Sequence, residues 1–197
     1  DFESLKLAAG TLLTSPHVPL IFMGEEYCES APFLYFMDFT DPGLRRAVSE
    51  GRKKEFESFH RQKEIPDPGR HETFDLSRID WNKRETGKHK IMLDFYTMLI
   101  GLRKKIPALS NLERKNVEIN VKNDIIIMKR RWKKSGALSI LGFNAKPAAF
   151  TVKESGWKKV FDSTDKKWLG AGASFPEKLT PGKRAEVSPH SFALYTK

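Results

Sequence analysis

Residues 18 to 36 read VPLIFMGEEYCESAPFLYF, and the first six of them form an unbroken apolar run between Pro16 and Gly24. A short apolar run bounded by turn residues is typical of a strand that is buried on both faces, as in a parallel sheet. Such a strand needs a parallel neighbour on each side. The next strand-like patterns begin only near residue 117 and look antiparallel. We therefore expect the partner strands to be encoded upstream of this chain.

Helical patterns lie on both sides of this run. Apolar residues recur at helical spacing from Phe2 to Leu13, and Ser15-Pro16 ends that pattern. Asp41-Pro42 is a helix start, with an acid at the N-cap and proline in the first turn. A further helix is predicted from about residue 88 to 105, with one apolar face and Pro107 at its end.

From about residue 109 the pattern changes to alternating strands and tight turns. Strands are expected at VEINV, IIIMKRRW and ALSILGFN, with turns at residues 123–124 and 134–136. Weaker strands are expected at 148–152, 157–162, 184–187 and 191–196. The predicted fold class is therefore α+β: the last helices and strand eight of a (β/α)8 TIM barrel in residues 1–108, followed by an antiparallel β-sheet or sandwich domain in residues 109–197.

Composition limits the classes of function. The chain has 197 residues, a net charge of +10 and one cysteine, Cys28. Its basic residues are scattered in short groups without a nucleic-acid motif, so we expect a solvated surface and no nucleic-acid partner. One cysteine excludes a disulfide framework and suits the cytoplasm. We expect no membrane span, metal or cofactor, since no long apolar run, metal-spaced cluster or phosphate loop is present.

Two adjacent carboxylates follow the predicted strand, at the strand end where barrel enzymes bind their substrates. Glu25 and Glu26 cannot both point the same way from an extended backbone, so one could face a cleft while the other turns to the wall. The alternative is structural: one acid accepts hydrogen bonds from loop backbone and the other pairs with an arginine. The residues alone leave both readings open.

Aromatic residues surround the same stretch. Rings at a barrel rim provide platforms for the apolar faces of sugars, and Tyr27, Phe33, Tyr35 and Phe36 could form one. The alternative is that Phe33 and Phe36 belong to the core and that only Tyr27 or Tyr35 reaches solvent.

These motifs resemble a known family. The run SPHVPLIFMGEEYCESAPFLYFMDFTDPGLRRAVSEGRKKEF, then IPDP, TFDLSRIDW and LIGLRKKIPAL, is similar to the C-terminal part of maltooligosyltrehalose trehalohydrolase, in the alpha-amylase superfamily of glycoside hydrolases. The similarity covers about residues 1–109 and is most specific at 16–56.

The resemblance implies an enzyme that hydrolyses the α-1,4 bond next to the terminal trehalose of maltooligosyltrehalose, by a retaining mechanism. Its catalytic carboxylates would lie on earlier barrel strands, so no catalytic residue is assigned here, and this chain alone is expected to be inactive without the N-terminal part of the enzyme. By matching position the expected substrate-binding residues are Glu25, Glu26, Tyr27, Phe33 and Asp38. The family usually has glycine where Cys28 stands, and a positive φ there would strain the turn.

Other readings remain open. A related α-glucan enzyme such as a branching enzyme shares a Gly-Glu pattern after strand eight, although the PFLYFMDFTDP stretch argues against it. The chain could instead be a non-catalytic carbohydrate- or nucleic-acid-binding module. Against that, a self-sufficient module would not encode a two-face apolar strand that has no neighbours.

Overall fold

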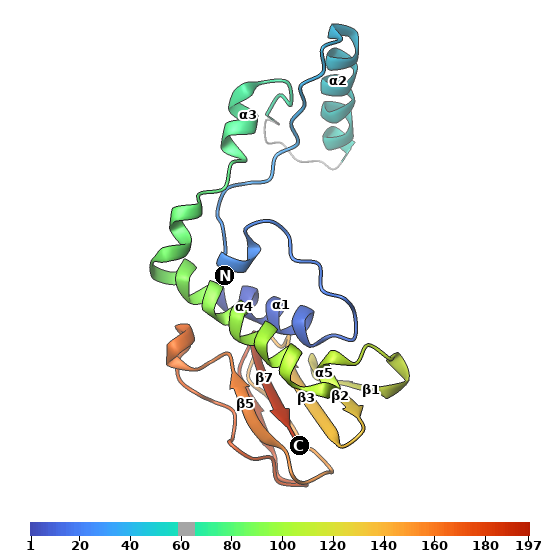
Figure 1. Ribbon diagram of the computed structural model, residues 1–197, viewed down its shortest axis with the longest axis vertical. Coiled ribbons are helices and arrows are strands. Elements are labelled where there is room, and N and C mark those ends of the chain that lie inside the picture. Colours follow the sequence, from blue (N-terminus) through green and yellow to red (C-terminus); the bar gives the residue numbers. More distant parts are fainter. Residues whose placement is uncertain (59–65) are drawn as a thin grey trace. The chain divides into compact units, whose positions relative to one another are not determined.

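The computed structural model describes residues 1–58 and 66–197 (Figure 1). Its contacts divide the chain into two units, one of residues 1–28 with 83–197, here the helix–sheet unit, and one of residues 29–82, here the 29–82 unit. The helices are α1 (Phe2–Thr14), α2 (Pro42–Ser58), α3 (His71–Leu76), α4 (Gly87–Lys105) and α5 (Pro107–Ser110). Short 3-10 turns lie at η1 (Glu25–Tyr27), η2 (Trp81–Glu85), η3 (Arg114–Asn116) and η4 (Lys166–Trp168).

The strands form one large and one small antiparallel sheet. The large sheet has the order β1-β2-β3-β7-β5, and β4 pairs with β6 in the small one. Their bounds are β1 (Val117–Lys122), β2 (Ile125–Trp132), β3 (Ser135–Gly142), β4 (Ala148–Phe150), β5 (Lys158–Asp162), β6 (Ala185–Val187) and β7 (Ser191–Thr196). Every strand predicted after residue 109 is therefore present, and the α+β class with its antiparallel sheet is confirmed.

Two tight hairpins join the first three strands. Asn123 and Asp124 both adopt positive φ, 51° and 58°, as the two-residue turn favoured by twisted hairpins requires. The second turn lies at Lys133-Lys134, because Trp132 pairs with Ser135. It was expected one residue later, and the strand that follows therefore begins at Ser135.

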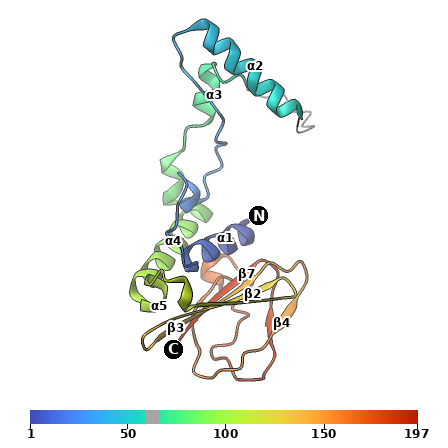
Figure 2. The ribbon, with the colours of Figure 1, turned by 90° about the vertical axis from the view of Figure 1, so that its right-hand side faces the viewer.

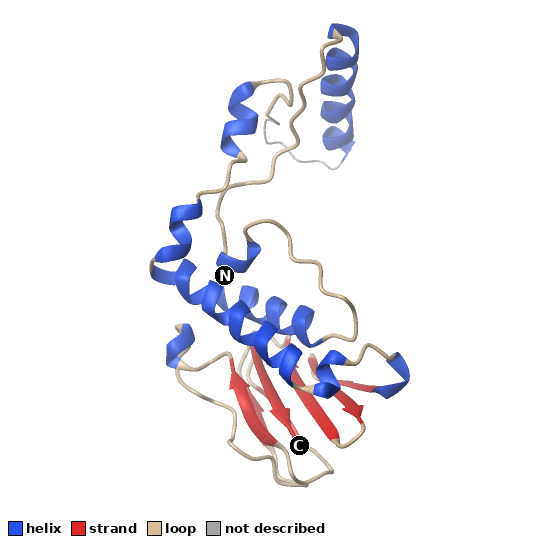
Figure 3. Cartoon of the chain, in the orientation of Figure 1, coloured by secondary structure: helices blue, strands red, loops and turns tan. Residues whose placement is uncertain are grey.

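Helices α1 and α4 lie side by side on one face of the large sheet (Figures 2 and 3). The predicted apolar stripe of α4 is buried there, with Met92 and Phe95 at 0% exposure and Leu99 at 2%. Gly10 of α1 lies so close to β7 that a Cβ would fall 2.6 Å from the ring of Phe192. This core includes Leu7, Leu13, Met92, Phe95, Leu99, Leu109, Phe161, Trp168, Phe192 and Leu194.

The opposite face of the large sheet has its own core. Phe150 of β4 and Val187 of β6 pack there with side chains from β3 and β7, so the two sheets form a small sandwich. Trp157 is 1% exposed in this layer. The other members include Ile125, Leu138, Ile140, Phe175, Leu179, Ala193 and Tyr195.

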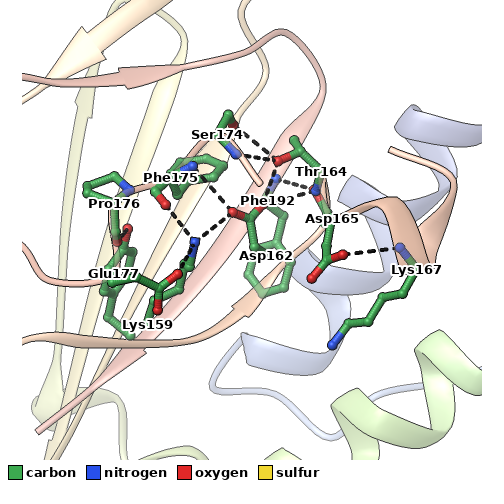
Figure 4. Close-up of polar contacts among 12 residues, drawn as sticks. Lys159, Asp162, Thr164, Asp165, Lys167, Ser174, Phe175, Pro176, Glu177 and Phe192 are labelled. Carbon is green, nitrogen blue, oxygen red and sulfur yellow. Dashed lines mark hydrogen bonds and ion pairs between the residues drawn. The ribbon is translucent and has the colours of Figure 1, made fainter. Parts of the chain in front are cut away.

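A buried carboxylate, that of Asp162, stabilises the C-terminal end of β5 (Figure 4). Asp162 accepts hydrogen bonds from the backbone N–H and hydroxyl of Thr164, at 3.0 and 2.6 Å, and from the N–H of Phe175 at 3.3 Å. Lys159 forms ion pairs with Asp162 at 3.1 Å and with Glu177 at 2.9 Å. Because the buried charges are paired, this network fixes the segment 174–177 beside β5.

The predicted strand at residues 18–23 is not a strand in the part of the chain that the structure describes; Figure 3 draws this segment as a loop. Four of its six side chains are exposed, with Val18 at 77%, Leu20 at 84%, Phe22 at 49% and Met23 at 50%, while Ile21 packs against the helix–sheet core. A strand exists only with hydrogen-bonded neighbours, and no described segment pairs with this one. The apolar run predicted to be a buried strand is therefore an irregular segment with most of its side chains exposed.

The predicted boundary near residue 108 does not coincide with the division made by contacts. Helices α1, α4 and α5 belong to the same unit as the sheet, while residues 29–82 form the other. The assignment of residues 1–108 to a barrel and of 109–197 to a separate domain stays a prediction.

Candidate functional site

The two adjacent acids lie in a tight turn rather than at the end of an extended strand. Gly24 has φ 86°, the turn η1 spans Glu25–Tyr27, and Cys28 has φ 50° and ψ 50°. Within the turn the N–H of Glu25 donates to the carbonyl of Phe22 at 3.0 Å and the N–H of Cys28 to that of Glu25 at 3.0 Å. Successive side chains of a 3-10 turn diverge by about 120°, so the two carboxylates still point in different directions.

Cys28 occupies a left-handed conformation that glycine adopts without steric cost. For a residue with a Cβ this conformation costs about 1–2 kcal/mol. The strain expected from cysteine at this position is therefore present. Its Sγ lies 3.4 Å from Nδ1 of His89, and the side chain packs against the helix–sheet core.

Helix α4 fixes the turn from one side. Nδ1 of His89 lies 2.9 Å from the carbonyl oxygen of Tyr27, which accepts its hydrogen bond, and the hydroxyl of Tyr96 donates to Oε1 of Glu25 at 3.2 Å. Burial raises the pKa of Tyr96, and the neighbouring charge of Glu25 raises it further. His89 and Tyr96 were not predicted to take part. The available signal is that they are seven residues apart on one helix, and so share a face.

The alternative hypothesis gave both acids structural roles, and the described residues supply a partner for only one of them, Glu25. Glu25 is half-buried and has a tyrosine hydroxyl as its partner, not the loop backbone or arginine that this alternative named. Glu26 is also half-buried, and among the described residues no hydrogen bond or ion pair is found for its carboxylate. Within this turn, Glu26 is therefore the acid whose polar atoms remain available to a ligand.

Two arginines, of which Arg130 is buried and Arg103 half-buried, anchor the chain just before the apolar segment. Arg103 donates to the carbonyls of Ser15 and His17, at 2.8 and 2.6 Å, and Arg130 donates to those of Thr14 and Ser15, at 2.6 and 2.7 Å. Cations are favoured at a helix C-terminus, where carbonyls lack partners. Burial, and then the charge of Arg103, lowers the pKa of Arg130 to about 10.

The structure divides the five predicted residues between its two units. Glu25, Glu26 and Tyr27 share one turn of the helix–sheet unit, whereas Phe33 and Asp38 belong to the 29–82 unit. Tyr27 is 1% exposed, so its ring lies in the core instead of facing solvent. Phe33 is 63% exposed, and Asp38 is exposed as well.

The aromatic residues of the 29–82 unit are mostly at its surface. Tyr35 is 45% exposed and lies under the guanidinium of Arg52, 4.9 Å from the ring centre. Phe36 contacts Phe74 edge to face, with ring centres 5.1 Å apart. The alternative that placed Phe33 and Phe36 in the core is therefore wrong: these rings are exposed and Tyr27 is buried. Exposed rings of this kind could contact sugar faces.

A separate cavity of about 580 Å³ lies over β1–β3. Its lining contains none of the five predicted residues. Two of its acids are already engaged in ion pairs: Glu118 with Lys129, and Glu154 with Lys129, Arg131 and Lys197.

No family model matches the chain. Curated relatives do: a malto-oligosyltrehalose trehalohydrolase of Brevibacterium helvolum is 40% identical over 125 residues, 63% of this chain and 21% of that protein. One of Saccharolobus solfataricus is 33% identical over 199 residues, 99% of this chain and 29% of that protein.

A solved structure from Salmonella typhimurium, described as an alpha amylase, matches 99% of this chain and 31% of its own with a TM-score of 0.76 at 32% identity. The chain thus spans between a fifth and a third of the length of these proteins, which is consistent with the expected match to a C-terminal part. The resemblance of this chain to malto-oligosyltrehalose trehalohydrolase, in the alpha-amylase superfamily, is therefore confirmed.

Proposed function

We propose that the chain is part of a glycoside hydrolase that cleaves the α-1,4 bond next to the terminal trehalose of maltooligosyltrehalose and releases trehalose. The observation that carries this proposal is the 33% identity, across 99% of the chain, to the malto-oligosyltrehalose trehalohydrolase of Saccharolobus solfataricus. The proposed location is the cytoplasm. None of the helices in the described residues is long and apolar enough to cross a membrane.

In this proposal the chain contributes substrate contacts and no catalytic carboxylate. A retaining glycosidase needs two carboxyl groups about 5–5.5 Å apart that flank the scissile bond. Glu25 is engaged by Tyr96, and the side chains of Glu25 and Glu26 diverge from the turn. We assign Glu26 to direct contact with sugar hydroxyls and Glu25 to positioning of the turn, with Phe33 and Asp38 as further contacts from the 29–82 unit. Tyr27 supports the turn from the core.

The exposed apolar segment at residues 18–23 has a place in the same proposal. In a longer protein of this family, preceding barrel strands would pair with it and cover Val18, Leu20 and Phe22. An uncovered apolar strip of this kind is unusual at a protein surface. The N-terminal part of the same enzyme is therefore the proposed partner of this chain.

The first experiment separates the reaction from the role of this chain. Maltotriosyltrehalose is incubated with the chain as given and with the chain extended upstream through its full reading frame, and free trehalose is quantified. We expect release only by the extended protein. Release by the 197-residue chain alone would overturn the assignment of the catalytic carboxylates, whereas release by neither would overturn the proposed reaction.

The second experiment tests the site in the extended protein. Glu26→Gln is expected to raise KM for maltotriosyltrehalose about tenfold, because a charged hydrogen bond to a sugar hydroxyl contributes about 1.5–3 kcal/mol. Glu186→Gln on β6 is the matched control, since this exposed acid lies outside the proposed site. Equal KM values for the two variants would remove Glu26 from the binding site.

A further inference from the structure

The two edges of the large sheet differ in how they are covered. The edge strand β5 is joined by the segment that follows it, through the bridge between Lys158 and Lys178 and a 2.9 Å hydrogen bond from the N–H of Lys159 to the carbonyl of Glu177. The edge strand β1 pairs with β2 along its whole length, from Val117 to Lys122. In the described part of the chain, no backbone group bonds to its outer side. β1 is thus an open edge.

This open edge lacks part of the usual protection. Natural edge strands are commonly blocked by proline, a bulge or charged side chains, and of these β1 carries only the charges, Glu118 and Lys122. β1 contains no proline, and its register with β2 runs without interruption. On one face it exposes Ile119 at 58% and Val121 at 65%, while Glu118, Asn120 and Lys122 alternate on the other face. An uninterrupted edge with exposed apolar side chains is a ready template for another strand.

The sequence of β1 is complementary to itself in one register. In an antiparallel pair centred on Asn120, Glu118 of each copy faces Lys122 of the other, and Ile119 of each copy faces Val121 of the other. Centring the pair on Glu118 or on Lys122 would instead place like charges opposite each other, which is unfavourable. Centring it on Ile119 would place Glu118 opposite Asn120 and Lys122 opposite Asn116. Centring it on Val121 would place Lys122 opposite Asn120 and Glu118 opposite Asp124, a second acid.

We propose that β1 binds β1 of a second copy of this chain, antiparallel and about a two-fold axis at Asn120, so that the two large sheets become continuous. The contact is isologous, as two-fold dimers require. It is also small: a six-residue edge buries less than the ~1,200–2,000 Å² of a standard interface, so the association is weak and concentration-dependent. The proposal does not depend on the hydrolase activity.

Cysteine cross-linking tests the register directly, in the full chain with Cys28 replaced by serine. Residues facing each other across antiparallel strands have Cα atoms about 4.5–5.5 Å apart, within the range that a disulfide spans. Under a glutathione redox buffer, Asn120→Cys is expected to form a disulfide-linked dimer by itself. Glu118→Cys and Lys122→Cys are expected to remain monomeric alone and to form a mixed dimer when combined. Non-reducing gels and intact mass measure the yields.

Two controls distinguish cross-links that form because β1 pairs with β1 from cross-links that form by random encounters between chains. Val160→Cys on the covered edge strand β5 is 41% exposed in the native chain and should not form dimers. In the Asn120→Cys chain, Lys122→Glu places two acids opposite each other and should reduce dimer yield severalfold, with partial recovery at high salt. The absence of a dimer with Asn120→Cys would overturn the proposal, and so would equal yields at positions 118, 120, 122 and 160.

Discussion

The two units of the chain hold their structure by different means. In the helix–sheet unit, even charged side chains are buried: Lys6 is 0% exposed and donates to the carbonyls of Ser163 and Trp168 at 2.7 and 2.9 Å. In the 29–82 unit, the described contacts lie mostly at the surface, such as Arg52 over Tyr35. Similar contacts in the two units should therefore contribute unequally to stability, because an unsatisfied hydrogen-bonding group costs much more free energy when it is buried than when water can reach it.

The largest effect is expected at Lys6, which joins α1 to the loop around η4. Lys6→Met keeps most of the side-chain volume but leaves two carbonyls, those of Ser163 and Trp168, without their donor. We expect a loss of about 3 kcal/mol in the free energy of unfolding. Urea titration of the chain measures it. A loss below about 1 kcal/mol would show that the burial of Lys6 is not what holds α1 in place.

The second effect tests close packing in the same unit. In Gly10→Ala the new methyl would lie 2.6 Å from the ring of Phe192, so we expect a loss of about 1–2 kcal/mol by thermal melting. Gly101→Ala is the matched control, because nothing lies within 4 Å of that position in α4. Helix propensity alone should then stabilise the control by about 0.5–1 kcal/mol. Equal shifts in both variants would contradict the close approach of α1 and β7.

A third prediction addresses the 29–82 unit. Asp41 caps α2, since its carboxylate accepts from the N–H of Leu44 at 2.7 Å. Asp41→Ala should cost about 1 kcal/mol and should act locally. Hydrogen exchange should accelerate at residues 44–46 while the exchange of α4 and β7 is unchanged, and Asp41→Asn should restore protection. Faster exchange throughout β7 would mean that the two units share their stability.

The smallest effect is a pH dependence at the surface of the sheet. Hydrogen bonds from Lys197, Arg131 and Lys129 lower the pKa of Glu154 from 4.5 to about 2. Because the folded pKa is the lower one, the stabilisation is complete above pH 4.5 and is lost as pH falls from 4.5 through 2. Solvent screening limits it to about 1 kcal/mol or less. In Glu154→Gln, the free energy of unfolding should therefore fall less steeply between pH 5 and pH 2 than in the unmodified chain. Urea titrations at several pH values would measure this difference.

The sequence predicted those elements whose stabilising contacts are local or periodic. The stripe of Met92, Phe95 and Leu99, the N-cap at Asp41 and the meander from β1 to β3 could all be read directly. The strand expected at residues 18–23 could not be settled in this way, because pairing depends on neighbours that no described segment provides.

The candidate site was predicted less completely than the fold. The pair of acids and its Gly24 turn were evident, but the partners of the turn were not: His89 and Tyr96 reach it across 62 and 71 residues. Contacts between segments so far apart leave no periodic signal. The burial of Tyr27 was missed for a related reason, since a single aromatic residue in a turn can face either side.

The position of β7 in the large sheet has a consequence for synthesis of the chain. β7 is the last strand in sequence, yet it lies between β3 and β5. Helix α1 packs on it, with Gly10 against the ring of Phe192. The bond from Lys6 to Ser163 closes a separation of 157 residues. On the ribosome, α1 and α4 therefore emerge long before the surface that buries them, and their apolar faces must wait exposed. Such long-range contacts slow folding. Until β7 has been synthesised, the exposed apolar faces of α1 and α4 could aggregate, and we expect chaperones to be needed to prevent this.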